Sequence, residues 1–258
     1  MKAIIMAAGV GSRLQKRLGN QPKCCTQVGD ELLIERMLRL LEGKGINDVA
    51  LVLGYYSEVV IGRLRGKTTA RFHINPFFHI TNSIASLWFA REELDGQDDV
   101  VILNGDLFFE SSLLDTVLAS KGEVVMFADP RRALEADYRF GYDHGKLRRF
   151  GKNLRVEDTN GEYVGIAKIH RSFVGTFRAG LEVLISAQQH NLWWEDVLFN
   201  LCAIQRPICV VEITDSFWAE VDYIEDFERI QAYLRNSQPS QAMPAPLDIP
   251  MQPRLVAV

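Results

Sequence analysis

The first feature of this sequence that could do chemistry is a glycine-containing segment near the N-terminus. An apolar stretch at residues 2–6 runs directly into Ala7-Ala8-Gly9-Val10-Gly11-Ser12. Small residues here let backbone N–H groups approach a polyphosphate closely, and a helix beginning there would point its partially positive end at the ligand. Arg13 and Lys23 would add two full positive charges. A tight turn between a strand and a helix explains the same residues without any ligand.

The glycine spacing matches neither of two common phosphate-binding motifs. The third glycine of a dinucleotide-binding GxGxxG sequence would fall at position 14, which is Leu14. The segment also lacks the GK[ST] ending of a P-loop. The spacing alone is therefore weak evidence for nucleotide binding.

Two carboxylates follow apolar segments later in the chain. Asp106 closes Asn104-Gly105-Asp106 after the apolar run at 100–103, and Asp222 closes Glu220-Val221-Asp222. Open α/β sheets bind ligands at the carboxyl ends of their strands, so the two carboxylates could meet there. An aspartate after a buried strand is as often a helix cap or turn residue.

Aromatic and acidic residues recur together in the C-terminal half. They occur as Trp193-Trp194-Glu195-Asp196, as Glu162-Tyr163 and as Phe217-Trp218. Ring faces and carboxylates can enclose a cationic head group, such as that of phosphocholine or 2-aminoethylphosphonate. Core packing is an equal alternative, because Trp194 precedes Val197 and Leu198 at helical spacing.

Asn82 and Ser83 form another polar pair that has two interpretations. Their amide and hydroxyl groups can pair with the edge of a pyrimidine base. Either residue could equally cap the helix expected from the apolar spacing of Ile84 and Leu87. Both functions can coexist at one position.

The elements that must position these residues alternate between short apolar runs and runs of helical period. Residues 2–6, 49–53, 100–103 and 124–127 are typical of strands buried on both faces of a parallel sheet. Residues 32–41 have the spacing of an amphipathic helix. We therefore expect an α/β fold with a doubly wound, mostly parallel, Rossmann-like sheet.

The pattern changes after residue 128. We expect a hairpin at 138–150 and a strand at 162–170, which would form an antiparallel extension of the sheet on the side of a second substrate. Helices are expected at 173–189, 194–202 and 224–234, and a strand at 208–213. The catalytic domain would then span residues 1–236. Prolines concentrate in residues 239–253, so 237–258 are expected to be a proline-rich C-terminal tail.

The composition excludes several classes of protein. With 29 Lys plus Arg against 33 Asp plus Glu, the net charge is −4, so we expect no nucleic-acid partner. No stretch approaches the ~20 apolar residues of a membrane-spanning helix, and we expect no membrane association. The cysteines at 24, 25, 202 and 209 lack metal-ligand spacing, which favours reduced thiols and a cytoplasmic location.

A longer string is more specific than any of these features. Residues 2–14, followed by Pro22-Lys23 and then by Leu33-Ile34-Glu35-Arg36, resemble the opening of the nucleoside-triphosphate transferase superfamily. This superfamily contains sugar-1-phosphate nucleotidyltransferases and the phosphocholine and phosphonate cytidylyltransferases. The resemblance covers roughly residues 1–236. It implies that an acceptor oxygen attacks the α-phosphorus of a nucleoside triphosphate and that pyrophosphate leaves.

The resemblance also implies roles for individual residues. Asp106 and Asp222 would hold Mg²⁺, while Arg13 and Lys23 would hold the triphosphate and Lys168 the acceptor. The implied nucleotide-binding residues are Ala7, Ala8, Gly9, Gly11, Ser12, Asn82, Ser83 and Gly105. The implied acceptor-binding residues are Glu162, Trp193, Trp194, Glu195, Asp196 and Trp218.

The segment Gly161-Glu162-Tyr163-Val164-Gly165, together with Trp194-Glu195-Asp196, resembles the small-acceptor cytidylyltransferases more than the hexose-1-phosphate enzymes. This resemblance favours CTP as the nucleotide. The acceptor would be a small phosphomonoester or phosphonate. A sugar-1-phosphate nucleotidyltransferase that makes an NDP-sugar is the chief alternative, and a non-catalytic nucleotide-binding module is another. A glycosyltransferase would show a DxD motif where this chain has Asn104-Gly105-Asp106. The sequence leaves a homodimer open.

Overall fold

A computed structural model gives the fold and describes residues 1–11, 21–202 and 207–237. The main sheet of this described part has 9 strands in the order β5-β4-β1-β6-β11-β8-β12-β10-β9. In that order their bounds are Arg71–Ile74, Asp48–Leu53, Lys2–Ala7, Val100–Asn104, Gly161–Ile169, Val124–Asp129, Cys209–Glu212, Lys146–Gly151 and Arg139–Asp143. The sheet confirms the expected α/β class.

The strand directions divide the sheet into two parts. Strands β5, β4, β1 and β6 are all parallel to one another. Strand β11 is antiparallel to β6 and to β8, and β10 is antiparallel to β12 and to β9. Because β8 and β12 pair in parallel, the extension is mixed rather than purely antiparallel.

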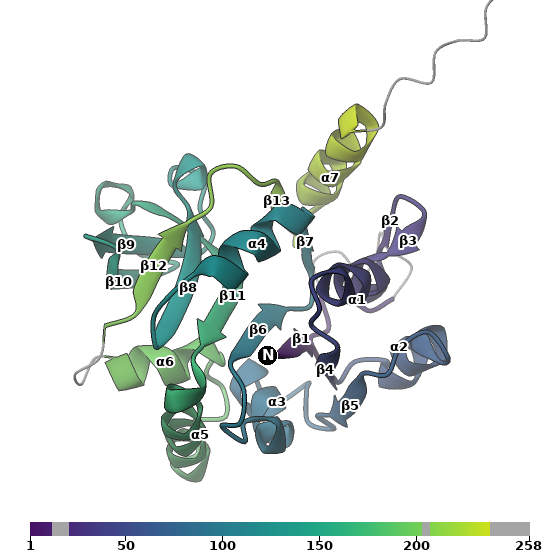
Figure 1. The fold of residues 1–258 in the computed structure, drawn as a ribbon, viewed down its shortest axis with the longest axis horizontal. Helices are drawn as coiled ribbons and strands as arrows, with labels where there is room; N and C mark the ends of the chain where they lie inside the picture. The colour runs from purple at the N-terminus through teal and green to yellow at the C-terminus, as the bar shows by residue number, and fades with distance from the viewer. Residues whose placement is uncertain (12–20, 203–206, 238–258) are drawn as a thin grey trace, which may run out of the picture.

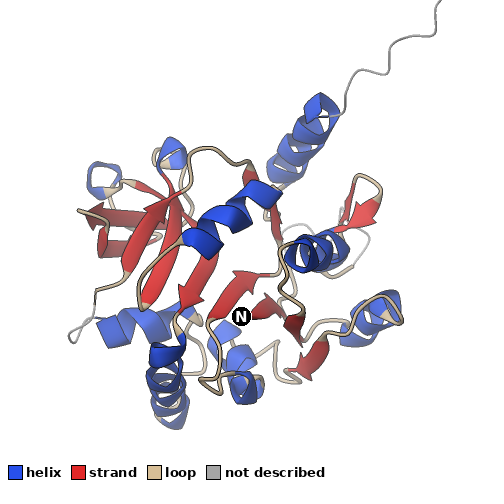
Figure 2. Ribbon diagram, in the orientation of Figure 1, coloured by secondary structure: helices blue, strands red, loops and turns tan. Residues whose placement is uncertain are grey.

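Helices cover both faces of the sheet, as Figures 1 and 2 show. One face packs against α1 (Leu33–Gly43), α2 (Ser57–Leu64) and α4 (Ser111–Ala119). The other packs against α3 (Ser83–Phe89), α5 (Arg171–Ser186) and α6 (Glu195–Cys202). Successive side chains of a strand point to opposite faces, so each central strand contributes to both cores.

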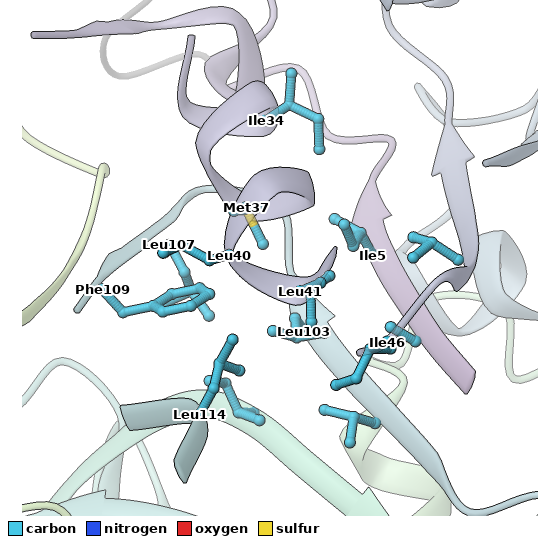
Figure 3. Close-up of a cluster of buried hydrophobic side chains, with 14 of the residues drawn as sticks. Ile5, Ile34, Met37, Leu40, Leu41, Ile46, Leu103, Leu107, Phe109 and Leu114 are labelled. Atoms are coloured by element: carbon cyan, nitrogen blue, oxygen red, sulfur yellow. The ribbon is translucent and has the colours of Figure 1, made fainter. Parts of the chain in front are cut away.

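Strand β1 shows this division most clearly. Ala3 and Ile5 belong to the first core, whereas Ile4 and Met6 belong to the second. Figure 3 shows Ile5 beside Leu41 of α1 and Leu103 of β6. A strand that is buried on both faces reads as a continuous apolar run, which is why the sequence predicted it well.

Smaller elements complete the fold around one end of the sheet. Strands β7 (Leu107–Phe109) and β13 (Trp218–Glu220) pair antiparallel, and α7 (Ile224–Ser237) packs through Ile230 against Phe108 and Val221. Strands β2 (Gln27–Val28) and β3 (Glu31–Leu32) form a separate hairpin. Short 3₁₀ helices occupy Lys23–Cys25, Arg91–Glu93, Pro130–Arg132 and Val156–Asp158.

Three further expectations concern the C-terminal tail, membrane-spanning helices and the cysteines. Helix α7 continues to Ser237, the first residue of the tail expected at 237–258, and residues 238–258 lie outside the described residues. None of the described helices combines the length and apolarity needed to cross a bilayer. Cys24, Cys25 and Cys209 are free thiols, two of them buried.

Candidate active site

A cleft of about 520 Å³ lies where β1 and β6 end. Residues after β1 and after β6 form one part of it, and the first residues of β11 form another. Strand β11 begins here because it is antiparallel to β6. The cleft therefore has a side built by the parallel part of the sheet and a side built by the extension.

Two glycines allow the close approaches that shape the first side. The Gly105 N–H donates to the Met6 carbonyl at 2.9 Å, and a Cβ at position 105 would lie 2.6 Å from Ala7 Cβ. Gly11 has φ of +63°, and a Cβ there would lie 2.5 Å from Lys23 Cγ. Only glycine fits both positions without displacement, so the pattern in the sequence has a steric cause.

Lys23 lies between the two aspartates that the sequence singled out. Its ammonium donates to Asp106 Oδ2 at 3.1 Å and also to Asp222 Oδ1. Burial opposes the charge of this lysine, but the two carboxylates overcome burial and raise the Lys23 pKa above its usual range. Carboxylates that are distant in the sequence thus meet around one cation.

Glu220 adds a third carboxyl group close to this pair. Burial, together with the charges of Asp106 and Asp222, raises its pKa well above the usual value. The Asn104 amide donates to Glu220 Oε1 at 3.4 Å. Glu220 therefore lies beside the aspartate pair as a carboxyl group whose charged form is disfavoured.

The aspartate pair is chemically suited to a hard divalent cation. Mg²⁺ is commonly bound through one or two carboxylates, with waters and substrate phosphates completing its shell. Within the described part of the chain, no cluster of three or more His, Cys, Asp or Glu side chains forms a complete metal site. Asp106 and Asp222, now neutralised by Lys23, fit the incomplete kind of site that substrate phosphates complete.

Asn82 and Ser83 both line the cleft and also act as structural caps. Asn82 Oδ1 accepts the Ser83 N–H at 2.8 Å and begins α3. Ser83 Oγ accepts the Trp194 N–H at 2.9 Å. Capping is therefore confirmed, and the Asn82 amide also donates to the Asn191 carbonyl at 3.3 Å at the lining of the cleft.

Aromatic and charged side chains line the second side of the cleft. The Tyr138 ring lies 5.7 Å from the Trp193 ring and 6.0 Å from the Tyr163 ring, measured between centroids. Lys152 Nζ lies 5.7 Å from the Trp193 ring centroid and donates to Asp137 at 2.7 Å. This side therefore already carries one cation over an aromatic face.

Glu195 is the most perturbed carboxyl group on this side. Burial, helped by the charge of the neighbouring Asp196, raises its pKa to about 8. Burial and the presence of Glu195 also raise the pKa of Tyr163 well above its usual value. A buried carboxyl without a cationic partner favours its neutral form until a positive charge arrives.

Comparison with known proteins decides the family. Residues 3–192 match the MobA-like NTP transferase domain. The chain belongs to this family. It is 40% identical over 252 residues to the choline-phosphate cytidylyltransferase of Streptococcus pneumoniae, which covers 92% of this chain and 99% of that protein.

A second relative and a solved structure agree with this assignment. The CTP:phosphoglutamine cytidylyltransferase of Campylobacter jejuni is 25% identical over 249 residues, covering 88% of this transferase and 98% of its own length. The solved CTP:phosphocholine cytidylyltransferase of Streptococcus pneumoniae superimposes with a TM-score of 0.71 at 20% identity. That superposition covers 90% of this chain and 98% of the solved one, and it shows the shared fold.

Most of the site residues expected from the sequence line this cleft of the transferase. They are Ala7, Ala8, Gly9, Gly11, Lys23, Asn82, Ser83, Gly105, Asp106, Asp222, Glu162, Trp193 and Glu195. Ser12 and Arg13 lie outside the described residues. The roles of all these residues stay predictions.

Lys168 does not reach the cleft, so the prediction that it binds the acceptor is wrong. Its ammonium donates to the carbonyls of Leu118 at 3.0 Å and Ser120 at 2.8 Å. Strand β11 is antiparallel to β6 and pairs Lys168 with Val101, near the start of β6. The cleft lies at the other end of β6, so Lys168 and the cleft are at opposite ends of the central strands.

Three more residues expected around the acceptor are placed elsewhere. Trp194 is fully buried, and its indole N–H donates to Asn104 Oδ1 at 3.0 Å. Trp218 is buried and donates to Asp129 Oδ2 at 2.9 Å, and Asp196 accepts the Trp193 N–H. Trp194 and Trp218 are therefore core residues, as the alternative interpretation held, and Asp196 caps the turn before α6.

The structure also adds cleft residues that the sequence did not single out for binding. They include Phe78, Thr81, Ser86, Asn104, Asp137, Tyr138, Lys152 and Glu220. Glu220 could have been found, because strand alternation places it two residues before Asp222 on the same face. The residues around Lys152 in the sequence do not indicate that it lines the cleft. Its position depends on the pairing of β10 with β9 and of β9 with β11.

Proposed function

We propose that this transferase moves CMP from CTP to a small phosphomonoester or phosphonate that carries a cationic head group, with release of pyrophosphate. The observation that carries the proposal is the composition of this cleft. One side presents glycine backbone and Lys23 with its aspartate pair, and the other presents Tyr138, Trp193 and the buried Glu195. A triphosphate and a cationic acceptor are the two ligands that suit these two sides.

The triphosphate would bind along the first side. Gly9 and Gly11 leave their backbone accessible there, and Lys23 supplies a positive charge. Lys23 would contact phosphate oxygens when the aspartates are neutralised by another cation. Asn82, at the rim of this side, would read the pyrimidine edge with its amide group.

Mg²⁺ would be held by Asp106 and Asp222. When bound, it supplies charge neutralisation for the triphosphate and the leaving pyrophosphate. Asp106→Asn should lower turnover by at least about a hundredfold and leave the far-UV circular dichroism unchanged. Asp115→Asn, at an exposed aspartate paired with Lys44, is the matched control and should keep full turnover. Near-normal turnover of Asp106→Asn would contradict the assignment.

The cationic head group would bind along the second side. A cation over an aromatic face is stabilised by ~2 kcal/mol when it is desolvated. The Trp193 ring already has the Lys152 ammonium 5.7 Å from its centroid. A bound ammonium group would also ionise Glu195, since an opposite charge favours the carboxylate. Relatives that act on choline phosphate and on phosphoglutamine, as their names state, support a small acceptor.

The reaction requires positioning more than acid–base chemistry. An oxygen of the acceptor phosphate, already an anion, forms a bond to the α-phosphorus, and the bond from that phosphorus to the bridging oxygen of pyrophosphate breaks. No general base is needed, so the residues of the cleft act by alignment and by charge. Lys23 would stabilise the charge that develops on pyrophosphate.

A matrix of pyrophosphate release tests the proposal. Each of the four common nucleoside triphosphates is combined with phosphocholine, phosphoethanolamine, 2-aminoethylphosphonate, glycerol phosphate and sugar 1-phosphates. We expect release with CTP and the cationic acceptors. Release only with sugar 1-phosphates would replace the proposal by NDP-sugar synthesis, and no release in any combination would favour a nucleotide-binding module.

A further inference from the structure

A second cavity, of about 330 Å³, lies outside the cleft. We call it the arginine pocket. It is formed where the 3₁₀ helix Pro130–Arg132, the segment before β13 and helix α7 meet. Its lining residues are Asp129, Arg131, Arg132, Thr214, Asp215, Ser216, Phe217, Trp218 and Arg229.

Arg131 already uses four of the five N–H donors of its guanidinium, and it builds the wall of the pocket. Its guanidinium donates to both oxygens of Asp129, at 2.9 and 2.8 Å. It also donates to the carbonyls of Thr214 and Ser216, at 2.5 and 3.0 Å. Asp129 additionally accepts the Trp218 indole N–H. The only fully buried carboxylate of the pocket lining is therefore saturated by these partners.

Arg229 is in a different situation, because most of its donors are unused. Its Nη2 donates to the Trp218 carbonyl at 3.2 Å, while its buried Nε has no hydrogen-bond acceptor. No carboxylate of the described residues forms an ion pair with it. Burial and then the nearby positive charge of Arg132 lower its pKa, although the carboxylates of Asp226, Glu162 and Asp129 act in the opposite direction. Its guanidinium carbon lies 5.6 Å from the Phe217 ring centroid.

Arg132 faces the same cavity with donors to spare. Its Nε donates to Glu162, which lines the cleft, and its two Nη groups make no hydrogen bond to any described residue. Its guanidinium carbon lies 5.6 Å from the Trp218 ring centroid. Arg132 and Arg229 thus stack on adjacent aromatic walls of one cavity, with unused N–H groups on both.

We propose that the arginine pocket binds a small oxyanion, a phosphate or carboxylate group held by Arg132 and Arg229. Two guanidinium groups that repel each other in a partly buried site are stabilised by an anion between them. Planar guanidinium N–H groups match the oxygens of phosphate and carboxylate, and the aromatic walls would exclude water around them. A bound oxyanion would accept hydrogen bonds from buried donors that have no acceptor in the free protein, such as Arg229 Nε.

Indole N–H signals in ¹⁵N-edited NMR spectra test the proposal, because the two cavities contain different tryptophans. Trp218 reports on the arginine pocket and Trp193 on the cleft, each assigned by a Phe substitution. Inorganic phosphate and, in a second arm, acetate are titrated at constant ionic strength. We expect the Trp218 signal to shift and saturate in at least one arm, and the arm that binds more tightly identifies the oxyanion class.

Arg229→Gln should remove this saturating shift of Trp218 or weaken the binding at least tenfold. Arg235→Gln, at an exposed position on the same helix, is the matched control and should bind as the wild type does. If Arg229→Gln fails to fold, Arg229→Lys should still weaken binding at least tenfold, because a lysine cannot replace the planar fork. A Trp218 signal that does not respond to either anion, or that responds equally in the Arg229 variants, would overturn the proposal.

Discussion

The buried indole N–H of Trp194 donates a hydrogen bond to Oδ1 of Asn104 at 3.0 Å, which ties the start of α6 to the end of β6. The amide N–H of Asn104 donates a hydrogen bond to Oε1 of Glu220 at 3.4 Å, beside the aspartate pair. The two sides of the cleft are therefore joined by one chain of contacts. Trp194 is a positioning residue rather than one that would touch the acceptor.

Trp194→Phe should cost stability through this contact. The variant leaves Asn104 Oδ1 without its buried donor, which costs about 1–3 kcal/mol of unfolding free energy. Denaturant titration followed by circular dichroism measures the change. The acceptor KM should rise less than the turnover number falls, since the residue does not line the cleft. Unchanged stability together with a tenfold rise in the acceptor KM would contradict this role.

Trp193→Leu should raise the acceptor KM and leave the stability of the protein nearly unchanged. The Trp193 ring is partly exposed in the cleft, so its loss should leave the unfolding free energy within about 1 kcal/mol. The acceptor KM should rise more than tenfold, because a desolvated contact between a cation and a ring contributes ~2 kcal/mol. Steady-state kinetics with phosphocholine at saturating CTP gives the comparison. An acceptor KM equal to that of the wild type would remove Trp193 from the site.

Lys168→Met should change stability and not catalysis. The variant leaves the carbonyls of Leu118 and Ser120 without their donor, so we expect a loss of about 1–3 kcal/mol in unfolding free energy. Both kinetic constants should stay within twofold of the wild type at a temperature where the variant is folded. A large rise in the acceptor KM with unchanged stability would instead return Lys168 to the acceptor site.

Glu195 should make stability depend on pH. Its pKa is about 8 in the folded chain and 4.5 in the unfolded chain, so the unfolded chain loses the proton first as the pH rises. The stabilising contribution of the neutral form is full below pH 4.5 and is lost as the pH approaches 8. Relative to the wild type, Glu195→Gln should gain roughly 3 kcal/mol between pH 5 and pH 8, at about 1.4 kcal/mol per pKa unit.

Urea titrations of both proteins across this pH range give the difference. A gap between wild type and Glu195→Gln that stays constant from pH 5 to pH 8 would show that Glu195 ionises normally in the folded protein.

The sequence predicted the parts of the site that depend on strand order and local pattern. Asp106 follows a strand buried on both faces, and such strands are recognisable as continuous apolar runs. Its meeting with Asp222 was expected at the carboxyl edge of the sheet. In the structure this meeting comes from the separate antiparallel pairing of β13 with β7, where the Val221 N–H donates to the Asp106 carbonyl at 2.9 Å. Gly11 was recognised through its type, and the structure supplies the steric reason, which is the passage of the Lys23 side chain.

The errors have a different physical origin. Alternation correctly placed Ile166 and Lys168 on one face of β11, but alternation does not tell which end of a strand lies at the cleft. That end depends on the antiparallel pairing of β11 with β6, a contact between distant parts of the chain. Trp194 and Trp218 have acidic residues near them in the sequence, which suggested a binding site. Whether an indole is buried, however, depends on the packing of distant parts of the chain. The arginine pocket joins Arg132 to Arg229 and has no local signature.

In the reaction proposed for the cleft, the acceptor phosphate becomes joined to the α-phosphorus of CTP. A ³¹P NMR time course of CTP and phosphocholine with Mg²⁺ and the wild-type protein follows every phosphorus atom of the reaction. We expect the phosphocholine signal to be replaced by a pair of diphosphate diester signals, with pyrophosphate appearing in equal amount. Free phosphate and CDP in place of these products, or a spectrum unchanged by the protein, would contradict this expectation.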